Sequence, residues 1–170
     1  MISKIRLWGA YSGFGLLAAF FALAADQLNK YWMIEIYEIG NRGRVAVTSY
    51  LDLVMLWNPG ISFGQLPQDG DLGRYLLTGF SLIAVIALSI WLAYAYSRLI
   101  AASIGLITGG ALGNLIDRTV HGAVADFFSF HYAGYYWYVF NIADVAITFG
   151  VLGLLIDWIA PGHTKVSKSV

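Results

Sequence analysis

Two aspartates stand among apolar residues, where a carboxylate is costly to ionise. Asp126 lies in the stretch AVADFFSF, residues 123–130, and no Lys or Arg occurs within seven residues of it on either side. Asp144 lies in FNIADVAIT, again with mainly apolar neighbours. Burial without a partner cation disfavours the charged form of a carboxylate. We therefore take Asp126 and Asp144 as candidates for acid–base chemistry.

Two close carboxylates cannot both ionise easily, so they share a proton. One then acts as a base and the other as an acid, as in the aspartic proteases. Other chemistries have weaker support. His121, Asp126 and His131 are spaced five residues apart and match no familiar metal-binding spacing. The chain has no Cys, which excludes disulfides, thiolate metal sites and Cys nucleophiles.

The composition predicts an integral membrane protein. Of the 170 residues, 59% are hydrophobic and only 12% are charged, and the mean hydropathy is +0.68. Soluble domains carry about 25% charged residues. The length suits one domain, 1–170. A net charge of zero gives no reason to expect a nucleic-acid partner.

Four apolar stretches predict a membrane all-α fold with four transmembrane helices. We place the spans at about 7–25, 75–97, 99–118 and 139–158, and only Asp144 interrupts the charge-free run 132–156. The first stretch is too long for the apolar core of a cleaved signal peptide, which is about 7–15 residues, so we expect it to be retained. Ser97, Arg98 and Leu99 leave almost no loop, which predicts a tight hairpin between the second and third spans.

The basic residues predict the orientation. Lys and Arg divide equally between the two sides, but those on one side lie in short tails and the tight loop, which dominate topology. We therefore expect cytoplasmic termini, on the side of Lys4, Arg6, Arg98, Lys165 and Lys168.

An amphipathic insert, 31–74, separates the first two predicted spans. In its segment VAVTSYLDLVMLW, polar and apolar residues alternate, which predicts a strand. Asn58-Pro59-Gly60 then predicts a turn, and ISFGQL predicts a second short strand. We expect a small extracytoplasmic β-element that rests on lipid or substrate. HGAVADFFSF, before the fourth span, is a possible extended strand. The aromatic run YAGYYWY, at 132–138, is typical of an interfacial anchor.

Several polar residues near the predicted spans have both a structural and a chemical interpretation. Asp26 and Lys30 are four apart, so they can pair on one helix face. Gly105, Gly109 and Gly113 recur on one face, which favours close helix packing. Asn114 and Asp117 follow, with Arg118 as the natural partner of a carboxylate, and a paired Asp117 suits a structural strut.

Two asparagines accompany the candidate aspartates. Asn58 and Gly60 suit a turn, and the Asn58 amide could also face a substrate. Asn141 precedes Asp144 with the same Asn-x-x-Asp spacing as Asn114 and Asp117. A carboxylate in the first turn of a helix is favoured by the helix dipole, which is a purely structural alternative for Asp144.

Five motifs, in order along nearly the whole chain, resemble those of one family. They are Asp26-Gln27 with Lys30, NPGISFG, GGALGNLIDR, VADF at 124–127 and FNIAD at 140–144. Together they resemble the lipoprotein signal peptidases, also called type II signal peptidases. The resemblance implies an intramembrane aspartic endopeptidase, multi-pass in the bacterial inner membrane, with its site toward the outer face.

The resemblance also implies a substrate and roles for single residues. The substrate is a prolipoprotein with a diacylglyceryl-modified Cys, cut just before that Cys. Membrane lipid is the other partner, no cofactor is needed, and globomycin is an inhibitor. Asp126 and Asp144 match the catalytic aspartates. The implied substrate-binding or supporting residues are Asn58, Gly60, Asn114, Arg118 and Asn141, and the structural polar residues are Asp26, Lys30 and Asp117.

The residues by themselves leave two other functions open. Carboxylates at membrane depth also serve as ion sites in transporters and proton relays, although both aspartates here are expected near one face. A non-catalytic assembly factor is the other alternative. A flux assay in liposomes and an incubation with a lipid-modified prolipoprotein separate these functions.

Overall fold

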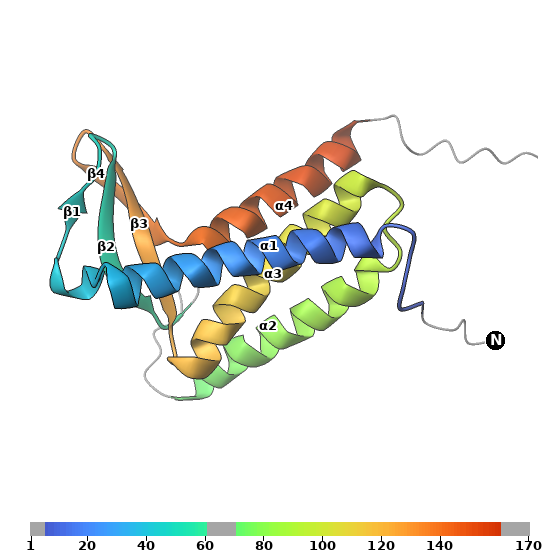
Figure 1. Cartoon of the computed structure of the whole chain (residues 1–170), viewed down its shortest axis with the longest axis horizontal. Helices are drawn as coiled ribbons and strands as arrows, with labels where there is room; N and C mark the ends of the chain where they lie inside the picture. The colour runs from blue at the N-terminus through green and yellow to red at the C-terminus, as the bar shows by residue number, and fades with distance from the viewer. Residues whose placement is uncertain (1–5, 61–70, 161–170) are drawn as a thin grey trace, which may run out of the picture.

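The computed structural model describes residues 6–60 and 71–160. It is mostly helical, with a small antiparallel sheet at one end of the helices (Figure 1). The helices are α1 (Ser12–Tyr31), α2 (Asp71–Leu92), α3 (Arg98–Val120) and α4 (Ile142–Ile159), and α1 continues into a π-helical turn, η1 (Trp32–Ile36), and a 3-10 turn, η2 (Ile39–Asn41). The strands are β1 (Val45–Ala46), β2 (Leu51–Asn58), β3 (Val124–Tyr132) and β4 (Tyr135–Phe140), in the spatial order β1-β2-β3-β4.

Among the described residues, three helical segments are long and apolar enough to cross a membrane: Gly73–Leu92, Arg98–Val120 and Ile142–Ile159. Helix α1 is the fourth helix of the bundle. It begins at Ser12, later than the predicted span 7–25, and it continues to Tyr31 because Asp26 and Lys30 are paired with each other and remain inside the helix. Ser97 caps α3 by accepting a hydrogen bond from the backbone N–H of Ile100.

The apolar run that begins at residue 132 is not all helix, which corrects the predicted span 139–158. Residues 135–140 form β4, and α4 begins only at Ile142. The Asn141 side chain accepts a hydrogen bond from the backbone N–H of Asp144 and so sets the helix start. The aromatic run 132–138, interpreted as an anchor, forms the tip of a β-hairpin: it includes the end of β3, the turn and the first part of β4.

The sheet draws its strands from two distant parts of the chain, whereas we predicted a β-element only between the first two spans. Strands β1 and β2 come from the insert, and β3 and β4 come from the connection between α3 and α4. The expected extended strand before the fourth span is β3. The predicted strand ISFGQL lies outside the described residues. In the observed register Leu56 lies opposite Asp126, next to a bulge that begins at Leu53.

A buried apolar cluster holds the sheet against the end of α1. Phe127 of β3 and Ile39 of η2 are fully buried, and Met33 and Ala125 complete the cluster. Because the sheet packs on the turns that extend α1, the strand that carries Asp126 has a fixed position relative to the helices.

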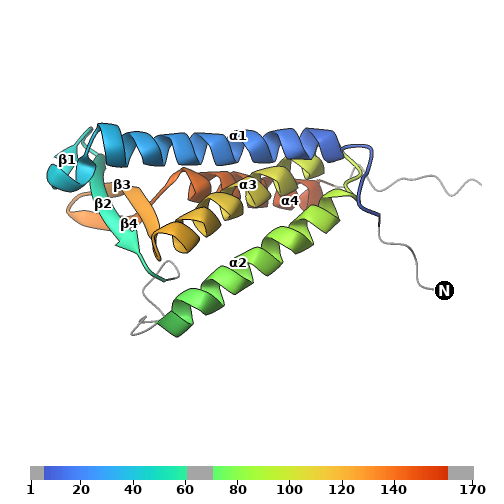
Figure 2. The same cartoon turned by 60° about the horizontal axis from the view of Figure 1, so that its bottom comes forward.

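Glycines let α3 approach its two neighbours closely. A Cβ on Gly105 would lie 2.1 Å from the carbonyl oxygen of Gly15 in α1, and one on Gly110 would lie 2.5 Å from the carbonyl oxygen of Ala143 in α4. Gly109 also faces α1, at Ala19. Small residues at such contacts are the usual means by which helices pack in membranes. The axis of α2, by contrast, diverges from α3 toward the end that carries the sheet (Figure 2).

We predict that Gly105→Ala destabilises the protein. The new methyl group would overlap the α1 backbone, and such overpacking costs about 1–3 kcal/mol. Gly79→Ala in α2 is the matched control, because a Cβ there meets nothing within 4 Å among the described residues. Alanine favours an exposed helix over glycine by about 0.5–1 kcal/mol. Thermal unfolding in one detergent should rank Gly105→Ala below the control, and the reverse order would contradict the close contact.

Candidate active site

Asp126 is buried on β3 and accepts hydrogen bonds from two asparagines. Asn58, at the end of β2, donates its amide to one carboxylate oxygen at 3.1 Å, and Asn141 donates to the other at 2.6 Å. The Asn58 side chain also accepts from the backbone N–H of Gly60 at 3.1 Å. The turn therefore orients the Asn58 amide, so that its N–H group is available to Asp126.

Asp144 lies in the first turn of α4 and forms a capping box with Asn141. The backbone N–H of Asp144 donates to the Asn141 side chain at 3.0 Å, and the Asp144 carboxylate accepts from the backbone N–H of Asn141 at 3.2 Å. Its second oxygen accepts from the Asn114 amide at 3.0 Å. These bonds fix the Asp144 side chain at the helix start, where the dipole favours a negative charge.

Two amides connect the two aspartates. Asn141 contacts both of them, and its amide nitrogen also donates to the Asn114 oxygen at 3.1 Å. Asn114 in turn donates to Asp144. Neutral donors thus bridge the two carboxylates, and the bridge joins β3, α3 and α4.

Burial and a neighbouring charge raise the pKa of Asp126 to about 7. Burial is the larger cause, and the negative charge of Asp144 adds to it. The hydrogen bonds from Asn58 and Asn141 and the charge of Lys30 act in the opposite direction. Both the protonated and the ionised form of Asp126 are therefore accessible near neutral pH, so that it can donate or accept a proton.

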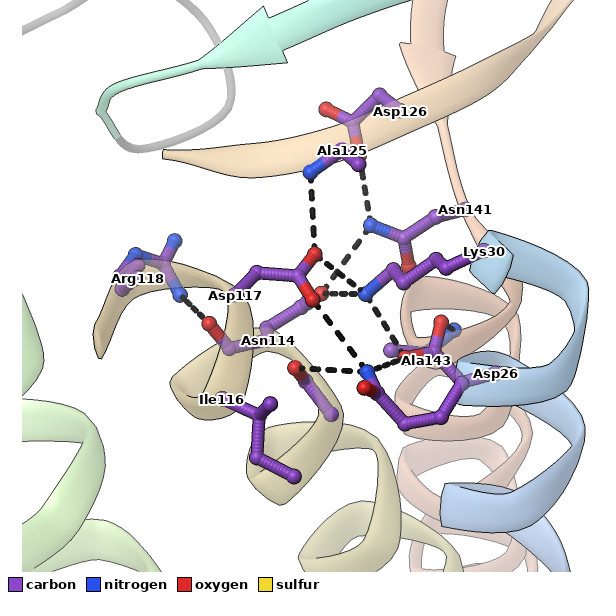
Figure 3. Close-up of polar contacts among 12 residues, drawn as sticks. Asp26, Lys30, Asn114, Ile116, Asp117, Arg118, Ala125, Asp126, Asn141 and Ala143 are labelled. Atoms are coloured by element: carbon purple, nitrogen blue, oxygen red, sulfur yellow. Dashed lines mark hydrogen bonds and ion pairs between the residues drawn. The ribbon is translucent and has the colours of Figure 1, made fainter. Parts of the chain in front are cut away.

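A buried ion cluster of Lys30, Asp26 and Asp117 lies near Asp126 (Figure 3). The ammonium of Lys30 contacts Asp26 at 2.8 Å and Asp117 at 2.7 Å, and it donates to the Asn114 oxygen at 3.3 Å. Gln27 donates its amide to both carboxylates of the cluster. The expected pair of Asp26 and Lys30 is therefore present. Because the Asn114 oxygen accepts from Lys30, the amide N–H group of Asn114 points toward Asp144.

The same cluster positions the backbone next to each candidate aspartate. Asp26 accepts from the N–H of Ala143 at 2.9 Å, and Asp117 accepts from the N–H of Ala125 at 3.1 Å. Ala125 precedes Asp126, and Ala143 precedes Asp144. The cluster therefore anchors both segments that carry the aspartates.

Arg118 is not the partner that we expected for Asp117. Successive helix residues point about 100° apart, so Asp117 faces Lys30 on α1 while Arg118 points away from it (Figure 3). Arg118 donates to the backbone oxygen of Asn114 at 3.3 Å. Its guanidinium is partly buried, and its Nε has no hydrogen-bond partner within the part of the chain that the structure describes.

Tyr138 was missed by the sequence reasoning. Burial, followed by the charges of Asp144 and Asp126, raises the pKa of its hydroxyl. Tyr138 also lines a cavity of about 750 Å³ with Asp144, and the other walls come from Phe130, Trp137, Phe140, Val145, Thr148 and Phe149. The aromatic run held the signal for Tyr138, but we assigned that run to anchoring.

The two histidines considered as metal ligands lie in different places. The His121 ring packs on Trp57, and His131 contacts Asp52 at 3.2 Å. Among residues 6–60 and 71–160, no group of three or more His, Asp or Glu side chains is placed to hold a metal ion.

The chain is similar in sequence to enzymes of known class. The sequence model of the family described as "Signal peptidase (SPase) II" matches residues 18–160. A "Lipoprotein signal peptidase" of Rhodopseudomonas palustris (strain TIE-1) is 50% identical over 147 residues, which cover 84% of this chain and 90% of that protein. One of Methylorubrum extorquens (strain PA1) is 46% identical over 156 residues, 92% of this chain and 91% of that protein.

Two solved structures are similar in fold. Both are described as bacterial membrane enzyme structures obtained by the in meso method. The one at 2.3 Å has a TM-score of 0.77 and 28% identity, and covers 98% of this chain and 99% of that chain. The one at 1.9 Å has a TM-score of 0.71 and 29% identity, and the match covers 94% of this chain and 99% of that chain. The family match over residues 18–160 and the close relatives together establish that this chain belongs to the signal peptidase II family.

Proposed function

We propose that this chain is an intramembrane aspartic endopeptidase that removes the signal peptide from diacylglyceryl-modified prolipoproteins by cutting before the lipidated Cys. Membership of the signal peptidase II family supports the peptidase activity, and relatives named lipoprotein signal peptidase support the substrate. One observation carries the aspartic mechanism. Asp126 and Asp144 are joined through the amides of Asn141 and Asn114.

Asp126 is the proton donor in this proposal, and Asp144 is the base. The raised pKa of Asp126, about 7, lets it hold a proton at neutral pH. We assign Asp144 as the base because it lies in the first turn of α4, and its oxygens accept from the Asn114 amide and the Asn141 backbone. Environments that differ in this way separate the acid from the base.

The reaction then proceeds by water attack. Asp144 takes a proton from water while the water oxygen bonds to the carbonyl carbon that precedes the Cys. Asp126 gives its proton to the carbonyl oxygen, which stabilises the charge that develops there. When the tetrahedral intermediate collapses, the carbon–nitrogen bond breaks, the Cys nitrogen takes a proton from Asp144, and one hydroxyl of the intermediate returns a proton to Asp126 as the carbonyl forms again.

The supporting residues hold this arrangement in place. Asn141 and Asn114 orient both carboxylates, and Asn58, held by Gly60, adjusts the pKa of Asp126. Arg118 has a different role in the proposal, because its guanidinium lies near the aspartates and its Nε is free among the described groups. We propose that Arg118 donates a hydrogen bond to a backbone carbonyl of the substrate.

The helices suggest four spans in the bacterial inner membrane. Helix α1 has 20 residues, about 30 Å, which matches a hydrocarbon core of about 30 Å. Its outward face is apolar and exposed, at Phe14, Leu17, Phe20, Phe21 and Leu28. We propose cytoplasmic termini, with the sheet and the aspartates toward the outer face, and we expect globomycin to inhibit.

We predict that Asp126→Asn and Asp144→Asn each lower cleavage at least about 10²-fold, since each removes one proton-transfer group. The assay is incubation of purified protein with a diacylglyceryl-modified prolipoprotein, followed by separation of the shorter product. Glu35→Gln is the control, because Glu35 is an exposed carboxylate, and its turnover should stay normal. Near-normal turnover of Asp126→Asn in folded protein would exclude the assignment.

We predict that cleavage declines as the pH rises through about 7, because Asp126 then loses the proton that it must donate. The hydrogen bond from Asn58 lowers the pKa of Asp126, so Asn58→Ala should raise that pKa and move the decline to higher pH. The measurement is kcat/KM against pH, with thermal unfolding at each pH as a check on folding. A decline that moves to lower pH in Asn58→Ala would refute this origin.

We predict that the ion cluster matters chiefly for stability. Lys30→Met leaves Asp26 and Asp117 buried without their cation, and breaking a buried pair costs about 3–5 kcal/mol. Asp117→Asn should lower the free energy of unfolding by less, because Lys30 still pairs with Asp26. The folded variant should retain some activity. Thermal unfolding should rank Lys30→Met below Asp117→Asn, with Glu35→Gln close to the parent protein. A stable but inactive Asp117→Asn would instead indicate a catalytic role.

A further inference from the structure

A second hollow lies on the β3–β4 hairpin, away from the two aspartates. Its volume is about 570 Å³, and neither Asp126 nor Asp144 lines it. Most of its walls are aromatic rings at the ends of β3 and β4, together with a ring from the turn before β2: Tyr50, Phe130, Tyr132, Tyr135, Tyr136 and Trp137. We refer to this feature as the aromatic hollow.

The rings of the aromatic hollow are exposed to an unusual degree. Tyr135 is 83% exposed, Trp137 72% and Tyr132 71%. Tyr50 and Tyr132 stack with their centroids 6.0 Å apart, so the walls also support one another. A cluster of large exposed rings on one hairpin marks an interaction site rather than scattered surface residues.

The aromatic hollow is continuous with the lipid-facing side of α4. It shares Phe130, Trp137 and Tyr138 with the cavity that runs along α4. That cavity ends at Phe149, which is 62% exposed on a helix of membrane-spanning length. An occupant of the hollow can therefore have a polar group among the rings and apolar chains beside α4.

The charges around the hollow favour a zwitterionic occupant. The face of an aromatic ring is negative and attracts cations, and cages of such rings bind quaternary ammonium groups. The Arg44 guanidinium lies 4.5 Å from the Tyr136 ring centroid and pairs with Asp52 through Nη1 at 2.8 Å. Its side chain is half exposed, so its other N–H groups can meet a phosphate.

We propose that the aromatic hollow binds the headgroup of a membrane phospholipid, with a quaternary ammonium against the ring faces, the phosphate toward Arg44 and the acyl chains along α4. The hollow adjoins the cavity that Asp144 lines, but the proposal does not rest on the peptidase chemistry. It gives the exposed rings of the hairpin a ligand, and it tethers the sheet to the lipid that surrounds α4.

The test compares two lipids that differ only in charge. Full-length protein is reconstituted with equal amounts of phosphatidylcholine and of its isostere in which carbon replaces the ammonium nitrogen, so that the second lipid lacks the cation and keeps the phosphate charge. Lipids that stay bound after detergent extraction are counted by native mass spectrometry. The expected preference for phosphatidylcholine is about tenfold. Trp137→Leu keeps an apolar side chain but loses the ring face, so its preference should fall to about onefold.

Two further variants serve as controls. Trp137→Phe restores a ring and should recover most of the preference. Trp158→Leu removes another exposed indole, 82% exposed, near the other end of α4 and should not change the lipid preference. Since the readout is bound lipid, failure of the catalytic assignment does not affect it.

Several results would overturn the proposal. Equal retention of the two lipids by the parent protein would reduce the hollow to an apolar anchor. Displacement of the lipid by an equal concentration of soluble phosphocholine would show recognition of a free headgroup instead. If Trp137→Leu keeps its lipid preference but loses prolipoprotein cleavage, the hollow serves the substrate.

Discussion

The burial of one lysine between two carboxylates is the constraint on which the rest of the structure depends. Lys30 reaches from α1 into a space where Asp26 and Asp117 are also withdrawn from water. A buried ammonium is tolerated only where its charge is matched and its donors are satisfied. Because the matching groups come from α1 and α3, those helices cannot slide or rotate without exposing an unpaired charge.

The spare hydrogen-bonding capacity of the cluster extends this constraint to the site. Asp26 also accepts from Ala143 at the start of α4, and Asp117 accepts from Ala125 at the start of β3. The two candidate aspartates follow those residues directly. The ion cluster therefore fixes the positions of both segments. The glycine contacts of α3 with α1 and α4 bring the helices close enough for the cluster to form.

Neutral amides, rather than cations, contact the two candidate aspartates. Asn58, Asn114 and Asn141 donate to the carboxylates without neutralising their charge. A lysine or arginine in direct contact would hold both pKa values low. With amides instead, burial and mutual repulsion dominate at Asp126, and its pKa stays near 7. The ammonium of Lys30 does not contact Asp144 directly, because Asn114 lies between them and accepts its hydrogen bond.

The sequence by itself determined those properties that depend on composition and short-range pattern. The apolar runs predicted a helical membrane protein, the spacing of Gly105 and Gly109 predicted a packing face, and the isolation of Asp126 and Asp144 singled them out. Five ordered motifs identified the family. Each of these signals is carried by neighbouring residues, because hydrophobicity, helical periodicity and the lack of a nearby cation can be read along the chain.

Only the tertiary structure decided which distant groups meet. It pairs Asp117 with Lys30 rather than with the adjacent Arg118, since successive helix residues point in different directions. It builds one sheet from strands on either side of α2 and α3. Most of the aromatic run thereby becomes part of β4, and Tyr138 lines the same cavity as Asp144. Strand pairing and buried ion pairs depend on how distant segments pack together, and local sequence pattern does not contain that information.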